Sequence, residues 1–263
     1  MREVIVDKSC EFQVGKFVKA SDVEQIVEGR FVKLSKRDGG TLAILCDSFG
    51  ELSEIELKQI LSAASPTANR GSASGSRTFK DRNMTRSVIV PSGVTGFFSE
   101  AGGLHSGACR QTSHWARHPS VRGAVKRVSL NAAKQMQEHA PEEYMAQSAA
   151  ASSMDQRWVI DGTPFTTVTV NDTWRTAAHR DAGDYAEGLG VMAFYAVGSG
   201  WSGGELAFPE YKIAIRPKSG QVILADVHEI HGNLPMAPNY PDGRRVSLVF
   251  YLRERMLRCV KQS

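Results

Sequence analysis

The sequence lacks the features of a membrane protein or of a small disulfide-stapled protein. No apolar run approaches the roughly 18 residues that a membrane-spanning helix needs. Its four cysteines (Cys10, Cys46, Cys109 and Cys259) lie far apart and form no C-x-x-C pair. A structural zinc site or a disulfide framework is therefore not expected, and we predict a reducing intracellular compartment. With 41% hydrophobic and 23% charged residues, the 263-residue chain is also not of the disordered class.

Positive charge is unevenly distributed along the chain. The stretch from Pro66 to Leu130 holds ten basic residues and only two acids, Asp81 and Glu100, whereas the whole chain has a net charge of +4. Basic charge collected in one segment indicates a polyanionic partner, with nucleic acid first. The alternative is a solvated basic loop. The ten residues are Arg70, Arg77, Lys80, Arg82, Arg86, Arg110, Arg117, Arg122, Lys126 and Arg127.

Three regions are predicted along the chain. Residues 1–64 form a small N-terminal α+β region, with strands near 4–6 and 41–45 and a helix over about 52–64. Residues 65–87 are rich in Ser, Gly and Arg and are predicted to be a basic linker or mobile loop. Residues 88–263 form the main domain.

The main domain begins with helices and continues with strands. Within 115–155, apolar spacing predicts a helix of about 20 residues from Val121, and a second helix begins at Pro141. Over 156–253, short runs rich in β-branched and aromatic residues are separated by Gly and Pro. Six such strands are expected, starting at Trp158, Phe165, Val191, Tyr211, Gln221 and Val246. This pattern predicts an α+β protein whose second half is an antiparallel sandwich or barrel.

Two segments of the strand-rich half hold a candidate metal site. In extended backbone, His179 and Asp181 point to the same face, with Arg180 pointing away. A histidine from the later segment, His228 or His231, completes the two-histidine, one-carboxylate set of Fe(II) oxygenases. We favour His231, because Gly232 beside it lets the backbone approach a crowded centre. H-x-D alone is weak evidence, since an isolated histidine is often a structural residue.

A candidate cosubstrate residue follows on the next strand. Arg245 lies 14 residues after His231. Its planar guanidinium suits a bidentate bond to a carboxylate, as the C5 carboxylate of 2-oxoglutarate requires. The order H-x-D, distant His and strand-borne Arg indicates a 2-oxoglutarate oxygenase.

Longer motifs around these residues carry a family resemblance over about 92–253. The sequence resembles the TET/J-binding-protein (TET/JBP) family of Fe(II)- and 2-oxoglutarate-dependent nucleic-acid dioxygenases. The His-Arg-Asp and Arg-Val-Ser-Leu-Val-Phe-Tyr strings are the most specific of its motifs. The motifs that carry the resemblance are Thr167–Asn171, Arg175–Asp184, Gly203–Pro209, Asp226–Asn233 and Arg245–Tyr251.

The resemblance implies a double-stranded β-helix, a jelly-roll or cupin-like core, with flanking helices. It implies that His179, Asp181 and His231 bind Fe(II) and that Arg245 binds 2-oxoglutarate, with Arg175 lining the cosubstrate or base pocket. Four further residues are implied at the substrate: Asp184 reads the polar edge of the base, Tyr251 stacks on it, Asn171 lines the pocket, and Arg253 stands where such enzymes often have a histidine.

The function implied is oxidation of a base in DNA. A flipped 5-methylcytosine is oxidised by O₂ at its C5 methyl to 5-hydroxymethylcytosine, with further oxidation left open. Thymine in DNA is the first alternative target, and a nucleoside or other small molecule is the second. A metal-free DNA-binding module is the non-enzymatic alternative. We further expect a monomer without a membrane partner, in the cytoplasm of a bacterial or phage-infected cell or in a eukaryotic nucleus.

Overall fold

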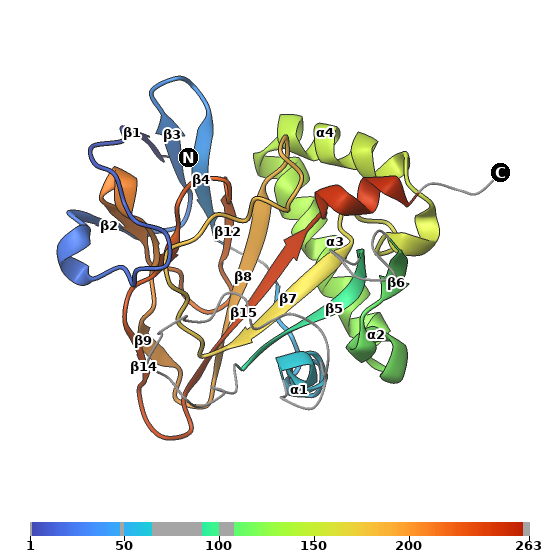
Figure 1. Cartoon of the computed structure of the whole chain (residues 1–263). Coiled ribbons are helices and arrows are strands. Elements are labelled where there is room, and N and C mark those ends of the chain that lie inside the picture. Colours follow the sequence, from blue (N-terminus) through green and yellow to red (C-terminus); the bar gives the residue numbers. More distant parts are fainter. Residues whose placement is uncertain (1, 48–49, 65–90, 100–107, 260–263) are drawn as a thin grey trace.

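Two facing sheets form the centre of the protein. The computed structural model describes residues 2–47, 50–64, 91–99 and 108–259 (Figure 1). The larger sheet contains, in spatial order, β1 (Arg2–Val6), β3 (Val32–Lys36), β4 (Thr41–Cys46), β12 (Val222–Ala225), β8 (Gly190–Val197), β15 (Arg244–Tyr251), β7 (Thr167–Asp172), β5 (Ser92–Ser99) and β6 (Cys109–Gln111). The smaller sheet contains β13 (Gly232–Asn233), β10 (Leu206–Phe208), β11 (Ile213–Ile215) and β2 (Gln25–Val27). A separate ribbon pairs β14 (Met236–Pro238) with β9 (Trp201–Gly203).

The central strands are apolar on both faces because both faces of the larger sheet are covered. On β8, Val191, Ala193 and Tyr195 pack with the helices, whereas Met192 and Phe194 pack toward the smaller sheet. Successive side chains of a strand point to opposite faces, so one strand contributes to both hydrophobic clusters. This layering, with two facing sheets and helices outside, agrees with the predicted α+β class.

Helices cover the outer face of the larger sheet (Figure 1). They are α1 (Glu54–Leu61), α2 (Ser113–Arg117), α3 (Val121–His139) and α4 (Pro141–Ser152). Ser53 and Glu56 form a capping box that starts α1, and Pro141 occupies the first turn of α4. The helices predicted from Val121 and from Pro141 are therefore confirmed.

The N-terminal strands are built into both sheets. β4 pairs with β12, with Ala43 opposite Ala225, and so extends the larger sheet. β2 pairs with β11 and so extends the smaller one. The run Leu42–Cys46 is buried along its whole length, because β4 has neighbours on both edges and cover on both faces.

Two predicted strands differ in the structure. The residues around Trp158 form a 3-10 turn, η4 (Gln156–Trp158), which starts where Asp155 accepts a hydrogen bond from the Arg157 amide. Tyr211 ends another such turn, η5 (Pro209–Tyr211), so that β11 starts only at Ile213. The predicted linker, residues 65–87, lies outside the described residues.

The expectation that the cysteines stay unbridged is wrong. Cys109 and Cys259 form a disulfide across a Cα–Cα distance of 6.0 Å. It ties β6 to the residue that follows η6 (Glu254–Arg258). A sequence separation of 150 residues hides such a pair from spacing arguments, because only the folded chain brings the two residues together. Cysteine usage thus gives no support to a reducing compartment.

No helix among the described residues is long and apolar enough to cross a bilayer.

Candidate metal and cosubstrate site

The two segments that carry the candidate ligands lie side by side. The His179 amide donates to the His231 carbonyl (2.9 Å) and the His231 amide to the His179 carbonyl (3.0 Å). A third bond runs from the Asp181 amide to the Val227 carbonyl (2.9 Å). These backbone bonds hold the two imidazole rings 4.3 Å apart, centre to centre.

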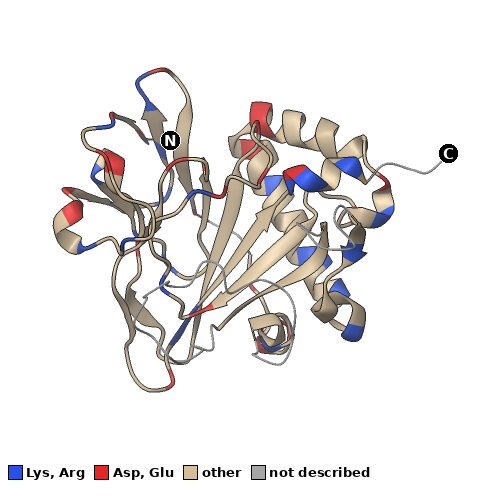
Figure 2. Cartoon of the chain, in the orientation of Figure 1, with Lys and Arg blue, Asp and Glu red and all other residues tan. Residues whose placement is uncertain are grey.

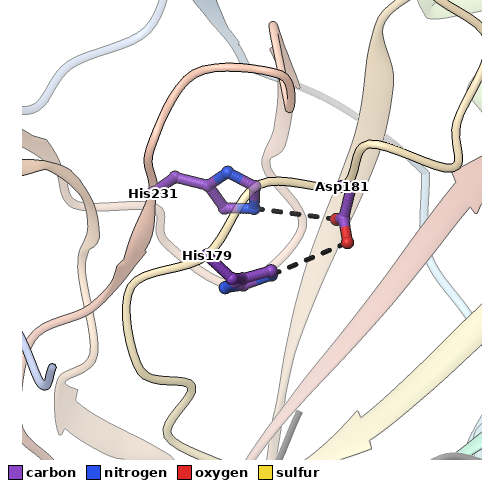
Figure 3. Close-up of side chains that lie close together, drawn as sticks. All are labelled: His179, Asp181 and His231. Atoms are coloured by element: carbon purple, nitrogen blue, oxygen red, sulfur yellow. Dashed lines mark ion pairs between the residues drawn. The ribbon is translucent and has the colours of Figure 1, made fainter. Parts of the chain in front are cut away.

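The three side chains converge on one point (Figure 3). The Nε2 atoms of His179 and His231 lie 3.8 and 3.7 Å from the two carboxylate oxygens of Asp181. Asp181 is only 8% exposed and His231 only 5%. Since two metal–ligand bonds of about 2.1 Å together span about 4.2 Å, one ion can reach all three groups. Two nitrogens and one carboxylate oxygen are the donor set of non-haem Fe(II) sites.

Both histidines are held with Nε2 toward the site. Nδ1 of His179 lies 2.8 Å from the Ala177 carbonyl, and Nδ1 of His231 lies 2.9 Å from the Glu229 carbonyl. A carbonyl can only accept, so each Nδ1 carries the proton and each Nε2 keeps a lone pair for a metal. Such a second hydrogen bond is characteristic of metal-binding histidines.

The structure brings His231, and not His228, to this centre. The Nε2 atom of His228 lies 3.4 Å from the Tyr185 carbonyl, away from Asp181. Gly232 explains part of the difference: a Cβ at this position would lie 3.1 Å from the Ala178 amide nitrogen. The close approach of the two segments therefore needs a residue without a side chain at 232.

The metal donors share a cavity with Arg245. His179, Asp181, His231 and Arg245 all line this cavity. Arg245 is 3% exposed, and its Nε has no hydrogen-bond partner among the described residues. Burial, partly offset by Glu205, lowers the pKa of Arg245 to about 10. A buried cation with an unsatisfied donor is costly unless an anion joins it, so the cavity fits a carboxylate of 2-oxoglutarate.

Ser247 lines the same cavity and was not identified from the sequence. It lies two residues after Arg245 on β15, hence on the same face. Its hydroxyl accepts from the Asn171 side-chain amide (3.3 Å) and keeps its own proton to donate. Strand alternation around Arg245 was the signal that could have revealed it.

Asn171 and Arg175 lie in different surroundings. Asn171 lines the cavity, and its Oδ1 accepts from the Ser92 hydroxyl (2.6 Å). Arg175 is not among the cavity-lining residues; it donates to the carbonyls of Val18 (2.6 Å) and Asn233 (3.3 Å). Arg175 thus connects an N-terminal segment to the strand after His231, instead of facing the cosubstrate cavity.

The three remaining predicted residues lie next to one another. Asp184 forms a backbone bridge with Arg253, and the Arg253 guanidinium carbon lies 5.6 Å from the centre of the Tyr251 ring. Tyr251 is 2% exposed, and its hydroxyl lies 3.1 Å from that of Thr169. The Tyr251 ring is therefore covered in this structure, and none of the three residues is among those that line the cavity of the metal donors.

Comparison with known proteins agrees with the donor set of the site, which is that of non-haem Fe(II) oxygenases. The sequence profile of the oxygenase domain of the 2OGFeDO superfamily, of TET/JBP type, matches residues 93–254. Thymine dioxygenase JBP1 of Crithidia fasciculata is 30% identical over 222 residues, covering 81% of this chain and 26% of that protein. The Trypanosoma brucei brucei protein of the same name is 32% identical over 168 residues, covering 63% and 19%. The chain thus spans about a fifth to a quarter of the length of these relatives.

A solved structure shares the fold. NgTET1 in complex with 5mC DNA matches 97% of this chain and 83% of that chain, with a TM-score of 0.61 and 12% identity. The fold and the site define a 2-oxoglutarate- and iron-dependent dioxygenase domain with a double-stranded β-helix core. The chain belongs to the TET/JBP family within that class.

Proposed function

We propose that the chain oxidises the C5 methyl group of 5-methylcytosine in DNA to 5-hydroxymethylcytosine. The observation that carries the proposal is that one cavity holds the three metal donors and the buried Arg245. Fe(II), 2-oxoglutarate and O₂ supply the oxidant for a C–H bond, with release of succinate and CO₂. The protein binds these groups: His179, Asp181 and His231 hold the metal, and Arg245 orients the distal carboxylate of the cosubstrate.

A base in duplex DNA reaches this cavity only by leaving the stack, which costs a few kcal/mol. Contacts between basic side chains and phosphates offset that cost. Lys and Arg occur on α2, along α3 and in η6 (Figure 2). Three of those on α3 already have acidic partners, since Lys126 pairs with Asp161, Arg127 with Glu56 and Lys134 with Glu138. Phosphate binding therefore falls mainly to the other basic residues.

Asp184 and Arg253 support cytosine as the target base. A carboxylate only accepts and a guanidinium only donates. At position 4 cytosine carries an amino donor and thymine a carbonyl acceptor, so a carboxylate that faces this position favours cytosine. Asp184 is 9% exposed, and the buried Nε of Arg253 has no partner among the described residues.

Thymine in DNA is the second candidate. It is favoured by the relatives, which are named thymine dioxygenases. The chemistry at the metal is the same for either base, because both targets carry a methyl group at C5. Only the groups around the base edge distinguish the two candidates.

Nucleoside mass spectrometry tests the proposal. Methylated and unmethylated copies of one duplex are incubated with the protein, Fe(II) and 2-oxoglutarate and are then digested. We expect 5-hydroxymethylcytosine from the methylated copy only, and none with Asp181→Ala. Formation of 5-hydroxymethyluracil from both copies would instead support the thymine candidate, and no oxidised base from either would overturn both.

Replacing Asp184 by Asn is predicted to lower oxidation of 5-methylcytosine relative to thymine. An amide can present a donor where the cytosine amino group needs an acceptor. A matched base contact contributes about 1–3 kcal/mol of discrimination, so the ratio should fall roughly 5- to 150-fold. The ratio is measured by competition between the two bases in one duplex. Asp242→Asn, on the distant β14–β15 turn, is the control and should leave the ratio unchanged; an unchanged ratio in Asp184→Asn removes this residue from base recognition.

Neutralising part of the basic segment is predicted to weaken DNA binding without changing base preference. Phosphate contacts carry no sequence information, and each one adds about −0.9 to the slope of log affinity against log salt. The variant neutralises four positions: Arg77, Lys80, Arg82 and Arg86. The control neutralises four exposed lysines outside the segment: Lys16, Lys19, Lys58 and Lys218. The salt slope should flatten only in the variant; equal slopes would mean that the segment is a solvated loop.

A further inference from the structure

A cluster of charged side chains lies behind the candidate metal ligands. We call it the rear ion cluster; it consists of Lys8, Lys36, Arg180, Glu210, Asp226 and Glu229. Three cations face three carboxylates, and the shortest contacts are Lys8 Nζ to Glu229 Oε2 (2.7 Å) and Lys36 Nζ to Asp226 Oδ2 (3.0 Å). The cluster joins the N-terminal strands, the η5 turn and both ligand segments, although these are far apart in sequence.

Arg180 links the two ligand segments directly. It lies between His179 and Asp181, and strand alternation turns it away from the metal side. Its Nη1 donates to the His228 carbonyl (2.5 Å) and lies 3.7 Å from the Glu229 carboxylate. The Arg180 side chain thus connects the segment of His179 and Asp181 to the backbone of His228 and to the carboxylate of Glu229.

Glu229 links the cluster to His231. Its backbone carbonyl is the acceptor that orients Nδ1 of His231 (2.9 Å). The Glu229 side chain is only 12% exposed, and its carboxylate forms ion pairs with Lys8, Lys36 and Arg180. Fixing this side chain also fixes the carbonyl of the same residue, and with it the imidazole that completes the ligand set.

We propose that Arg180 and Glu229 are positioning residues that set the spacing of the two histidine-bearing segments before a metal binds. The inference rests on His179, Asp181 and His231 being the metal ligands. Both residues act through backbone carbonyls of the later ligand segment: Arg180 donates to the His228 carbonyl, and the Glu229 carbonyl orients His231. Groups that orient first ligands in this way typically change metal affinity by 10- to 100-fold when removed.

The test measures metal binding and stability on the full chain. Co(II) serves as the probe, because its visible absorption reports coordination geometry and the assay needs neither DNA nor 2-oxoglutarate. Arg180→Met and Glu229→Gln are expected to weaken Co(II) binding about 10- to 100-fold and to alter the absorption spectrum. Arg180→Lys keeps the positive charge but lacks the planar guanidinium, so its Co(II) affinity should lie between those of the wild type and Arg180→Met.

A matched control separates positioning from general stability. Arg216→Met removes a guanidinium that contacts another buried acid, Glu205 (2.7 Å), outside the rear ion cluster. It should lower the Tm by a similar amount yet leave Co(II) affinity within about twofold of the wild type.

Failure of the positioning role and failure of the metal-ligand assignment give different results. If the wild type binds Co(II) through His231 but folded Glu229→Gln and Arg180→Lys show unchanged affinity and spectrum, the positioning role is wrong. Should Arg180→Met not fold, these two variants decide. If His231→Ala leaves Co(II) binding intact, the ligand assignment itself fails.

Discussion

His231→Ala is expected to abolish both metal binding and turnover. The imidazole is one of three candidate donors that the described residues bring to the site, and its Nε2 lies 3.7 Å from the Asp181 carboxylate. Removing a direct ligand should cost more than the 10- to 100-fold typical of residues that merely support one. We therefore expect metal affinity to fall more than about 100-fold and succinate formation to reach background. His179→Ala and Asp181→Ala should behave in the same way. Iron content after reconstitution and succinate release are the measurements.

His228→Ala is the matched control for this prediction. It removes the same side chain three residues earlier, where the imidazole faces the Tyr185 carbonyl. Iron content and turnover should stay near those of the wild type. The opposite result, with iron lost in His228→Ala and kept in His231→Ala, would contradict the assignment of the third ligand.

Arg245→Lys is expected to raise the 2-oxoglutarate concentration needed for half-maximal turnover by roughly 10- to 150-fold. Lysine keeps the positive charge but cannot form two parallel bonds to a carboxylate. Loss of one charge-assisted hydrogen bond corresponds to about 1.5 to 3 kcal/mol, which gives that range. The kinetic titration should show this increase while DNA affinity, measured without cosubstrate, stays the same.

The neighbouring arginine offers a control with identical chemistry. Arg244 points to the other side of β15, where its Nε donates to the Asp172 carboxylate (2.9 Å). Arg244→Lys should therefore leave the cosubstrate requirement unchanged. If Arg244→Lys raised the 2-oxoglutarate requirement and Arg245→Lys did not, the carboxylate would be bound by Arg244 instead of Arg245.

Sequence patterns predicted the features that are set by residues close to one another along the chain. Helical spacing predicted α3 and a helix-starting proline predicted α4. The alternation of a strand predicted that His179 and Asp181 share a face and that Arg180 does not. The choice of His231 over His228 also had a local basis, because only the former precedes a glycine.

The remaining features depend on contacts between distant residues. The N-terminal strands were treated as a separate region because nothing in Thr41–Cys46 shows which strand it will join; the structure pairs it with β12. The Cys109–Cys259 disulfide joins residues 150 positions apart. Arg175 was predicted to line the cosubstrate or base pocket because of its place in a motif; its hydrogen bonds to the carbonyls of Val18 and Asn233 join segments that the motif does not connect.

The most direct test of the proposed activity counts succinate and oxidised base in one reaction. The substrate is a duplex with a single 5-methylcytosine among many thymines, and its unmethylated copy is the control. Our account predicts one succinate for each oxidation step on the methylated cytosine, 5-hydroxymethylcytosine as the first product, and no DNA-dependent succinate with the control. Equal DNA-dependent succinate from both duplexes, accompanied by 5-hydroxymethyluracil, would contradict it.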